Sequence, residues 1–193
     1  MPSRSLHDWR TNGAAALDQI ENAHAAVGGN ARGRRYAMLQ INHAYLVLVS
    51  SHFQRFCRDL HTEAIERLCR QDLNADPRRD ILRVVLATNR QLDIRNPSPS
   101  AIGADFNRFN LNFWNSVKAV APAHNQRRQD LLEELNRWRN AIAHQDFLAR
   151  GLHPAALTLP MVRTFRRTCD LLAGRFDVVI GNHLATIPGV VPW

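Results

Sequence analysis

The chain has 193 residues, of which 45% are hydrophobic and 22% charged. This composition excludes collagen-like, low-complexity and disordered chains, and it predicts one globular domain that folds without disulfides or metals. The formal net charge of +8 indicates a polyanionic partner, either nucleic acid or an anionic membrane surface. Lys118 is the only lysine, so the positive charge resides on arginine, which binds phosphate in bidentate geometry.

The N-terminal third predicts two helices separated by glycines. Residues 11–27 form a helical pattern, and Gly28, Gly29 and Gly33 then interrupt it, so residues 1–33 are expected to be a loosely attached N-terminal helix. Residues 35–69 predict a long helix that is apolar on most sides in its first half, as in the central helix of a bundle. Its second half is amphipathic, and Glu63 is among the charged residues expected to face outward.

The middle of the chain predicts shorter elements. Asp76 and Pro77 are a helix start signal, and the apolar residues that follow include Ile81, Val84, Val85 and Leu92. Residues 96–100 predict a loop, and residues 106–120 predict a short helix.

The C-terminal part predicts two further main helices. Residues 126–143 are clearly amphipathic, and residues 162–179 carry apolar side chains at alternating steps of three and four. Residues 187–193 predict a tail. The whole chain is therefore expected to be a single all-α domain, an antiparallel helical bundle of four main helices plus minor ones.

The composition also bears on compartment and ligands. Cys57, Cys69 and Cys169 are an odd number without a close pair, which predicts reduced thiols inside helices rather than disulfides or a metal site. The N-terminus lacks the apolar stretch of a secretory signal, and the longest apolar run, residues 45–49, is too short to span a bilayer. We therefore expect a cytoplasmic protein with no membrane partner.

One short motif combines two residue types that can cleave RNA without a metal or other cofactor. Arg139 supplies a permanent planar cation for a phosphate, and His144 supplies a proton donor and acceptor. The 2′-hydroxyl of RNA attacks the adjacent phosphorus once a base removes its proton and a cation stabilises the phosphoryl oxygens. The pair is therefore a candidate catalytic site.

The spacing of these two residues creates a geometric problem. Five residues turn an ideal helix by about 500°, which leaves Arg139 and His144 roughly 140° apart around the axis. Two solutions are open: the helix ends or bends near Ala143, or a two-fold axis assembles the set from two chains.

The stretch from Arg139 to His144, preceded by a leucine-rich amphipathic helix, resembles the signature of the HEPN superfamily, an arginine followed after four to six residues by a histidine. Asn140 occupies the polar position that often follows the arginine. Residues 44–53 are similar to the long apolar helix of the RiboL-PSP-HEPN-like branch.

The resemblance implies an α-helical homodimer whose two copies of the motif line a shared cleft. It implies an endoribonuclease that leaves a cyclic phosphate end, acting as a toxin or as an effector of phage defence. Arg139 would then stabilise the phosphate, Asn140 would orient the arginine or the phosphate, and His144 would be the general acid and base. Asp146 stands where toxins silenced by tyrosine modification carry tyrosine, so an antitoxin or regulatory protein would act by another route.

Three other interpretations remain open at this stage. The chain could be a non-catalytic HEPN module that binds RNA, a nucleotide or a partner protein. It could instead be an interaction protein whose apolar seam at residues 162–179 pairs with another chain. A DNA-binding regulator ranks lower, because the sequence has no helix-turn-helix pattern.

Overall fold

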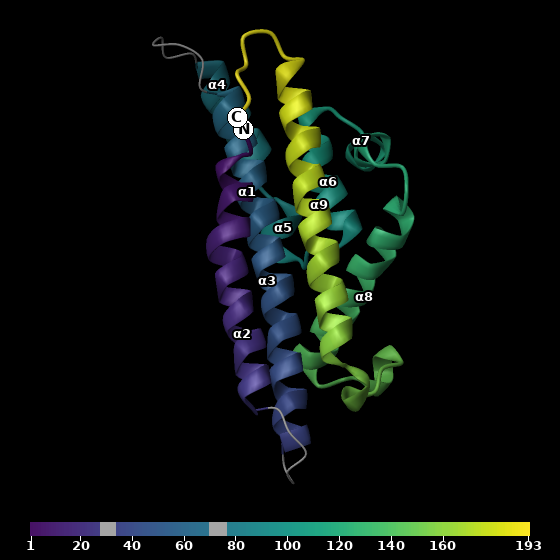
Figure 1. The fold of residues 1–193 in the computed structure, drawn as a ribbon. Helices are drawn as coiled ribbons and strands as arrows, with labels where there is room; N and C mark the ends of the chain where they lie inside the picture. The colour runs from purple at the N-terminus through teal and green to yellow at the C-terminus, as the bar shows by residue number, and fades with distance from the viewer. Residues whose placement is uncertain (28–33, 70–76) are drawn as a thin grey trace.

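The computed structural model describes residues 1–27, 34–69 and 77–193, and these are arranged as an elongated helical bundle (Figure 1). The described part contains α-helices and short 3₁₀ and π turns but no strand. The expected all-α bundle of four main helices is confirmed. These helices are α2 (Ala14–Val27), α3 (Arg34–Leu68), α8 (Asn125–His144) and α9 (Leu159–Ala185).

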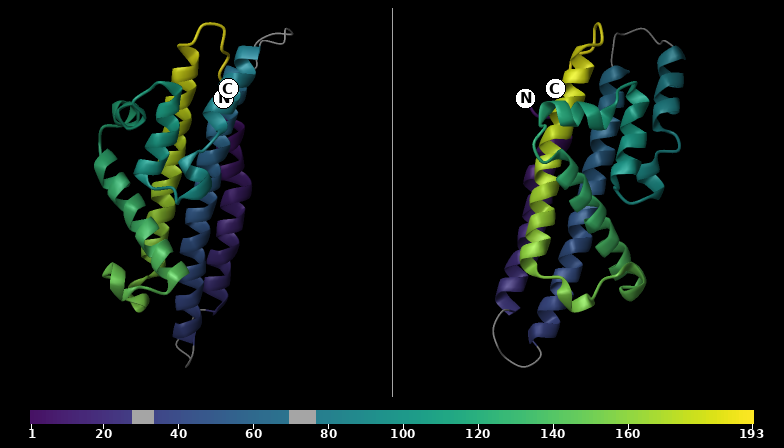
Figure 2. Two further views of the ribbon diagram at one scale, coloured as in Figure 1. Left: turned by 180° about the vertical axis from the view of Figure 1, so that it is seen from behind. Right: turned by 90° about the vertical axis from the view of Figure 1, so that its right-hand side faces the viewer.

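The central helix is α3, as its sequence predicts, because α2, α8 and α9 all pack against it. Figure 2 shows α2 and α3 as an antiparallel pair, with α8 and α9 as a second pair on the other side. Helices α3 and α9 run in the same direction, and α8 crosses them at a visible angle. The lower end of α8 therefore lies near the beginning of α3 and α9.

The core is formed mainly by the apolar faces of these four helices. From α3 it takes Tyr45, Leu46, Val49, Phe53 and Leu60, all of which are fully buried. Phe106, Phe113 and Phe176 add a cluster of stacked and edge-to-face rings from three further elements. Cys57 and Cys169 are free, buried thiols, as expected, whereas Cys69 is only partly buried.

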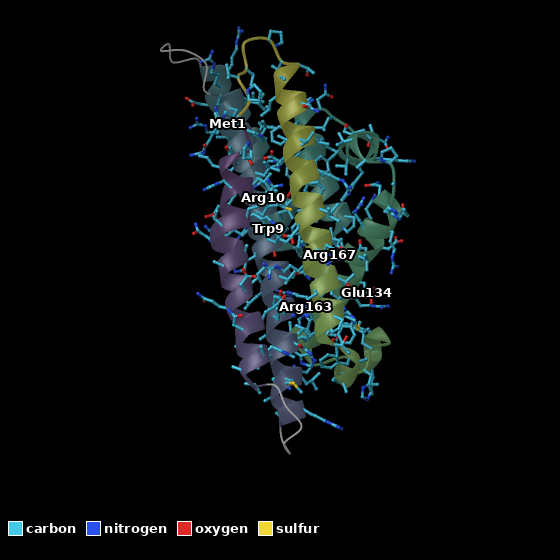
Figure 3. The ribbon with its side chains drawn as sticks, viewed as in Figure 1. Met1, Trp9, Arg10, Glu134, Arg163 and Arg167 are labelled. Carbon is cyan, nitrogen blue, oxygen red and sulfur yellow. The ribbon has the colours of Figure 1, made fainter. Side chains whose placement is uncertain are left out.

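The N-terminal segment packs firmly on the bundle, in contrast to the loose attachment expected from the sequence. The segment is helical from Arg4, through a π-helical turn at Trp9–Gly13 into α2. Trp9 and Leu17 are buried, and Trp9 Nε1 donates a hydrogen bond to Asp170 of α9 at 2.9 Å. Figure 3 shows Trp9 and Arg10 beside α9. The glycine-rich interruption lies outside the described residues.

Glu63 holds the beginning of this segment and does not face solvent as predicted. Its side chain is almost completely buried and accepts hydrogen bonds from the backbone N–H groups of Arg4 and Ser5, each at 3.0 Å. Burial alone would raise the pKa of this carboxyl, but these bonds hold the pKa below its usual value. The prediction failed because helix periodicity cannot anticipate a carboxylate that satisfies free N–H groups of another helix.

The predicted helix after Asp76 is split into two. Helix α4 (Pro77–Ala87) ends before α5 (Gln91–Ile94), so Leu92 belongs to a separate element and is buried there. Ile81, Val84 and Val85 are more than half exposed. Figure 2 shows α4 at the edge of the bundle, where only one side of the helix is covered. Asp76 itself lies outside the described residues.

Residues 96–120 also differ from their predicted pattern. The predicted loop ends early, because Ser98 caps α6 (Pro99–Phe106) by accepting a hydrogen bond from Ala101 N. The predicted short helix is interrupted by a 3₁₀ turn at Asn107–Phe109 and by Asn110, whose φ is +61°. It resumes as α7 (Phe113–Val120).

The apolar seam of α9 lies in the core of the same chain. Its six members are between 0% and 3% exposed: Val162, Phe165, Cys169, Leu172, Phe176 and Val179. The interpretation in which this seam pairs with another chain is therefore wrong. The C-terminal residues after α9 turn back, and Ile187, Val190 and Trp193 pack partly buried against the core.

The packing of the N-terminal segment predicts a contrast between two truncations. Leu17→Ala should lower the free energy of unfolding by about 2–5 kcal/mol, because it leaves a cavity in the core. Val84→Ala, on the exposed side of α4, should change it by less than about 0.5 kcal/mol. Urea denaturation followed by circular dichroism measures both, and a near-neutral Leu17→Ala would contradict the packing described.

Stability should also depend on the protonation of His61. This side chain is fully buried, with its ring against Phe106 and its Nε2 3.1 Å from the Asp105 carbonyl oxygen. Burial, with the positive charge of Arg90, lowers its pKa from 6.5 to about 4. The unfolded chain therefore takes up a proton at a higher pH than the folded chain does. The free energy of unfolding should fall by up to about 3 kcal/mol as the pH drops through this window.

The control for this pH dependence is His61→Gln, which has no titrating group at this position. Urea denaturation of both proteins at about pH 7 and about pH 4.5 isolates the contribution of His61. The wild type should lose more stability than the variant between these two conditions. Equal losses would show that His61 is not the group responsible.

Candidate active site

The predicted catalytic residues lie in the last turns of α8. The helix remains α-helical through His144 and ends there, because Gln145 adopts a left-handed backbone with φ +56°. The Gln145 side chain donates to the Ile142 carbonyl oxygen at 2.7 Å, and Asp146 N donates to the Ala141 carbonyl oxygen at 3.3 Å. These bonds satisfy carbonyl groups that the end of a helix leaves without partners.

The helix is continuous between the two residues, so the geometric problem posed by their spacing persists along the backbone. Arg139 and His144 differ by about 140° around the axis and by about 7.5 Å along it. Asn140 lies between them in direction, about 100° from Arg139 and only about 40° from His144. Arg139 and Asn140 are half-buried, whereas His144 is exposed.

The direction of the arginine side chain reduces the angular separation between Arg139 and His144. Arg139 Nη1 donates a hydrogen bond to Asn140 Oδ1 at 3.3 Å, so the guanidinium turns toward the face that also carries His144. Asn140 Oδ1 accepts a second hydrogen bond, from Asn96 Nδ2, at 2.6 Å. With its oxygen occupied twice, the Asn140 amide presents its N–H groups on the opposite side, where the described residues offer no acceptor.

Asn96 is itself fixed by the residues on either side of it in the chain. Gln54 of α3 donates to the Arg95 carbonyl oxygen at 2.8 Å and to the Leu92 carbonyl oxygen at 2.7 Å. Asn136 of α8 donates to the Pro97 carbonyl oxygen at 3.1 Å. The loop around Asn96 is therefore held between α3 and α8.

The surroundings of His144 are formed by the segment that follows it. Asp146 is ion-paired with Arg150, with Nε and Oδ1 2.7 Å apart, and this contact holds the pKa of the Asp146 carboxyl below its usual value. A shallow depression of about 370 Å³ begins directly after His144, and its lining includes Phe147, Leu148 and His153. The residue two positions after His144 is thus an ion-paired aspartate.

Trp138 anchors this end of α8 in the core, as predicted, and is not available to stack on a base. Its side chain is 2% exposed and contacts Phe147 edge to face. Phe147 stacks in turn on His43 of α3, whose Nε2 lies 3.2 Å from the Pro154 carbonyl oxygen. The segment after His144 is therefore held on the beginning of α3.

The structure joins the side chains of Arg139 and Asn140, two of the three predicted site residues, by a hydrogen bond, whereas no hydrogen bond among the described residues joins the His144 side chain to either. Sequence reasoning missed Asn96, which lies 44 positions from its partner in a loop without a chemical motif. The only sequence signal was the presence of asparagines at positions 136 and 140, one turn apart on α8, both of which need partners when buried.

Metal-binding clusters and membrane-spanning helices are both absent from the part of the chain that the structure describes. No three histidine, cysteine, aspartate or glutamate side chains there lie close enough together to hold a metal ion. None of the described helices combines the length and the hydropathy that a membrane span requires.

The comparison with protein families agrees with the helical arrangement. The family model RiboL-PSP-HEPN matches residues 8–176, which is most of the chain. The chain therefore belongs to the RiboL-PSP-HEPN family. No curated protein and no solved structure matches it.

Proposed function

We propose that the protein is a metal-independent endoribonuclease in which Arg139, Asn140 and His144 act on one phosphodiester. The observation that carries this proposal is the hydrogen bond from Arg139 to Asn140, which turns the guanidinium toward the face of α8 that bears His144. The resulting surface offers N–H donors from Arg139 and Asn140 to an anion and, one turn further on, a histidine that transfers protons. The net charge of +8 favours the approach of RNA.

The proposed reaction uses the 2′-hydroxyl of the substrate as the nucleophile. A histidine takes the proton of this hydroxyl. The 2′-oxygen forms a bond to phosphorus at the same time, and the bond from phosphorus to the 5′-oxygen breaks. The leaving oxygen receives a proton from a second acid. Arg139 stabilises the negative charge that increases on the phosphoryl oxygens. The products are a 2′,3′-cyclic phosphate and a 5′-hydroxyl end.

We propose further that the working enzyme is a two-fold homodimer. The backbone positions of His144 and Arg139 in one chain are about 140° apart around the helix, and the hydrogen bond to Asn140 closes only part of this separation, so a second copy would supply the arginine or histidine that completes the set around one phosphate. His144 and its neighbour Ala143 are both exposed at the end of α8, and the small side chain of Ala143 permits close approach. Two copies would also supply two histidines, one for the base and one for the acid.

Replacement of the histidine tests the nuclease directly. Purified wild type should cleave total RNA in EDTA and leave cyclic phosphate ends, whereas His144→Ala should fold normally and lose cleavage by at least about 100-fold. His7→Ala, at an exposed histidine of the N-terminal segment, is the matched control and should cleave as the wild type does.

Three results would bear on the alternatives. Cleavage by a folded His144→Ala protein would exclude the mechanism. Tight RNA binding without cleavage by the wild type would favour a non-catalytic module that binds RNA. Growth arrest on expression of the wild type, but not of His144→Ala, would support the proposed role as a toxin or defence effector held in check by a partner protein.

Mixing two inactive variants tests the shared site. A heterodimer of Arg139→Ala and His144→Ala contains one intact arginine and one intact histidine, on different chains. If one phosphate is held by Arg139 of one chain and His144 of the other, co-refolded mixtures should regain a measurable part of the wild-type rate. Persistent inactivity in a mixture shown to contain heterodimers would mean either that each site is built within a single chain or that the shared site needs the histidines of both chains.

A further inference from the structure

We infer that Asn96, which lies outside the Arg139–His144 motif, is a positioning residue of the proposed cleavage site and fixes which face of the Asn140 amide meets the phosphate. This inference rests on the proposed function, because it concerns the same anion site. It adds a residue from a distant loop to a set that otherwise comes from one helix.

The first step of the argument is the direction of the amide. Asn96 Nδ2 can only donate, so the atom of Asn140 that lies 2.6 Å from it must be the oxygen. Arg139 Nη1 can also only donate, and it lies 3.3 Å from the same oxygen. Both neighbours therefore select one orientation of the Asn140 amide, in which its two N–H groups face away from them.

The second step is the chemistry of the outward face. Guanidinium and amide N–H groups are donors without acceptor capacity, so together they complement a phosphodiester oxygen and not a cation. If the amide turned over, its oxygen would face the anion and repel it, and Arg139 would lose its acceptor. The contact from Asn96 therefore sets the sign of the partial charge presented to the ligand.

The third step is the rigidity of Asn96. The carbonyl oxygens on both sides of it are held, that of Arg95 by Gln54 and that of Pro97 by Asn136. Gln54 belongs to α3 and Asn136 to α8, so the loop cannot shift without breaking bonds to both helices. Asn96 can therefore direct the amide of Asn140, while its own position depends on the core of the bundle.

The first test is a double-mutant cycle on RNA cleavage by the full chain. Asn96→Ala should keep the fold and lower kcat by about ten- to a hundred-fold, because the arginine and the amide are no longer held in place. Because Asn96 acts through Asn140, Asn96→Ala should have little further effect in an Asn140→Ala background. The inference would be overturned if the kcat of the double variant fell by the product of the two single-variant factors, or if Asn96→Ala kept the kcat of the wild type.

The second test separates a positioning role from a structural one. Asn96→Asp is nearly isosteric, but its carboxylate requires a donor and would turn the Asn140 amide over, so it should lower kcat more than Asn96→Ala does. Ser98→Asp adds the same charge two residues away and keeps the capacity to cap α6, so it should leave kcat close to that of the wild type. A milder effect of Asn96→Asp than of Asn96→Ala would overturn the inference.

The third test does not require cleavage. Fluorescence anisotropy measures the Kd of a 2′-deoxy oligonucleotide, which presents phosphates but no nucleophile. Asn96→Asp should raise this Kd at least about ten-fold more than Ser98→Asp does. If the wild type binds but never cleaves RNA, this difference would support the role of Asn96 while the proposed nuclease fails. Equal Kd values for the two variants, or a wild type that neither binds nor cleaves, would refute it.

Discussion

The structure depends on the burial of one long helix. In the first half of α3, Tyr45, Leu46 and Val49 are fully buried whereas Tyr36 and Ala44 are exposed, so water is excluded from a broad part of its circumference. A single neighbour cannot do this, and α2, α8 and α9 each cover a different side. The position of α8, and with it the candidate site, follows from this requirement, because Trp138 and Leu135 must face the core. Once those side chains are buried, the rotation of α8 about its own axis is fixed.

Apolar packing places the helices, and side-chain hydrogen bonds then fix the loop that lies between α3 and α8. Asn136 and Asn140 lie one turn apart on α8 and both meet the loop at residues 96–97, while Gln54 holds the same loop from α3. These side-chain amides link the central helix to the candidate site through one short segment. A buried amide without a partner is destabilising, so each of these bonds favours one arrangement of the loop over its alternatives.

The candidate site combines two residues that are held by hydrogen bonds with a histidine that is exposed. Arg139 and Asn140 are hydrogen-bonded to each other and to the body of the protein, whereas His144 stands exposed at the helix end. A straight helix separates the groups that the chemistry needs together, and this separation is the physical reason to expect a second chain. Within one chain, the apolar seam of α9 is already used by the core, so the proposed dimer would form through other surfaces.

The sequence alone determined the helical class, the central role of α3, the burial of Trp138 and the presence of the arginine–histidine motif. These features follow from local periodicity and from short-range spacing, which one stretch of chain carries by itself. It also predicted that a straight helix would keep Arg139 and His144 apart.

The tertiary structure decided the features that depend on partners distant in the sequence. It buried Glu63 because the N–H groups of Arg4 and Ser5 meet it, and it left Val84 exposed because no helix among the described residues covers that side of α4. It also brought Asn96 to Asn140 across 44 positions. Periodicity shows which face of a helix is apolar, but it does not show which polar group another segment will bring to that helix.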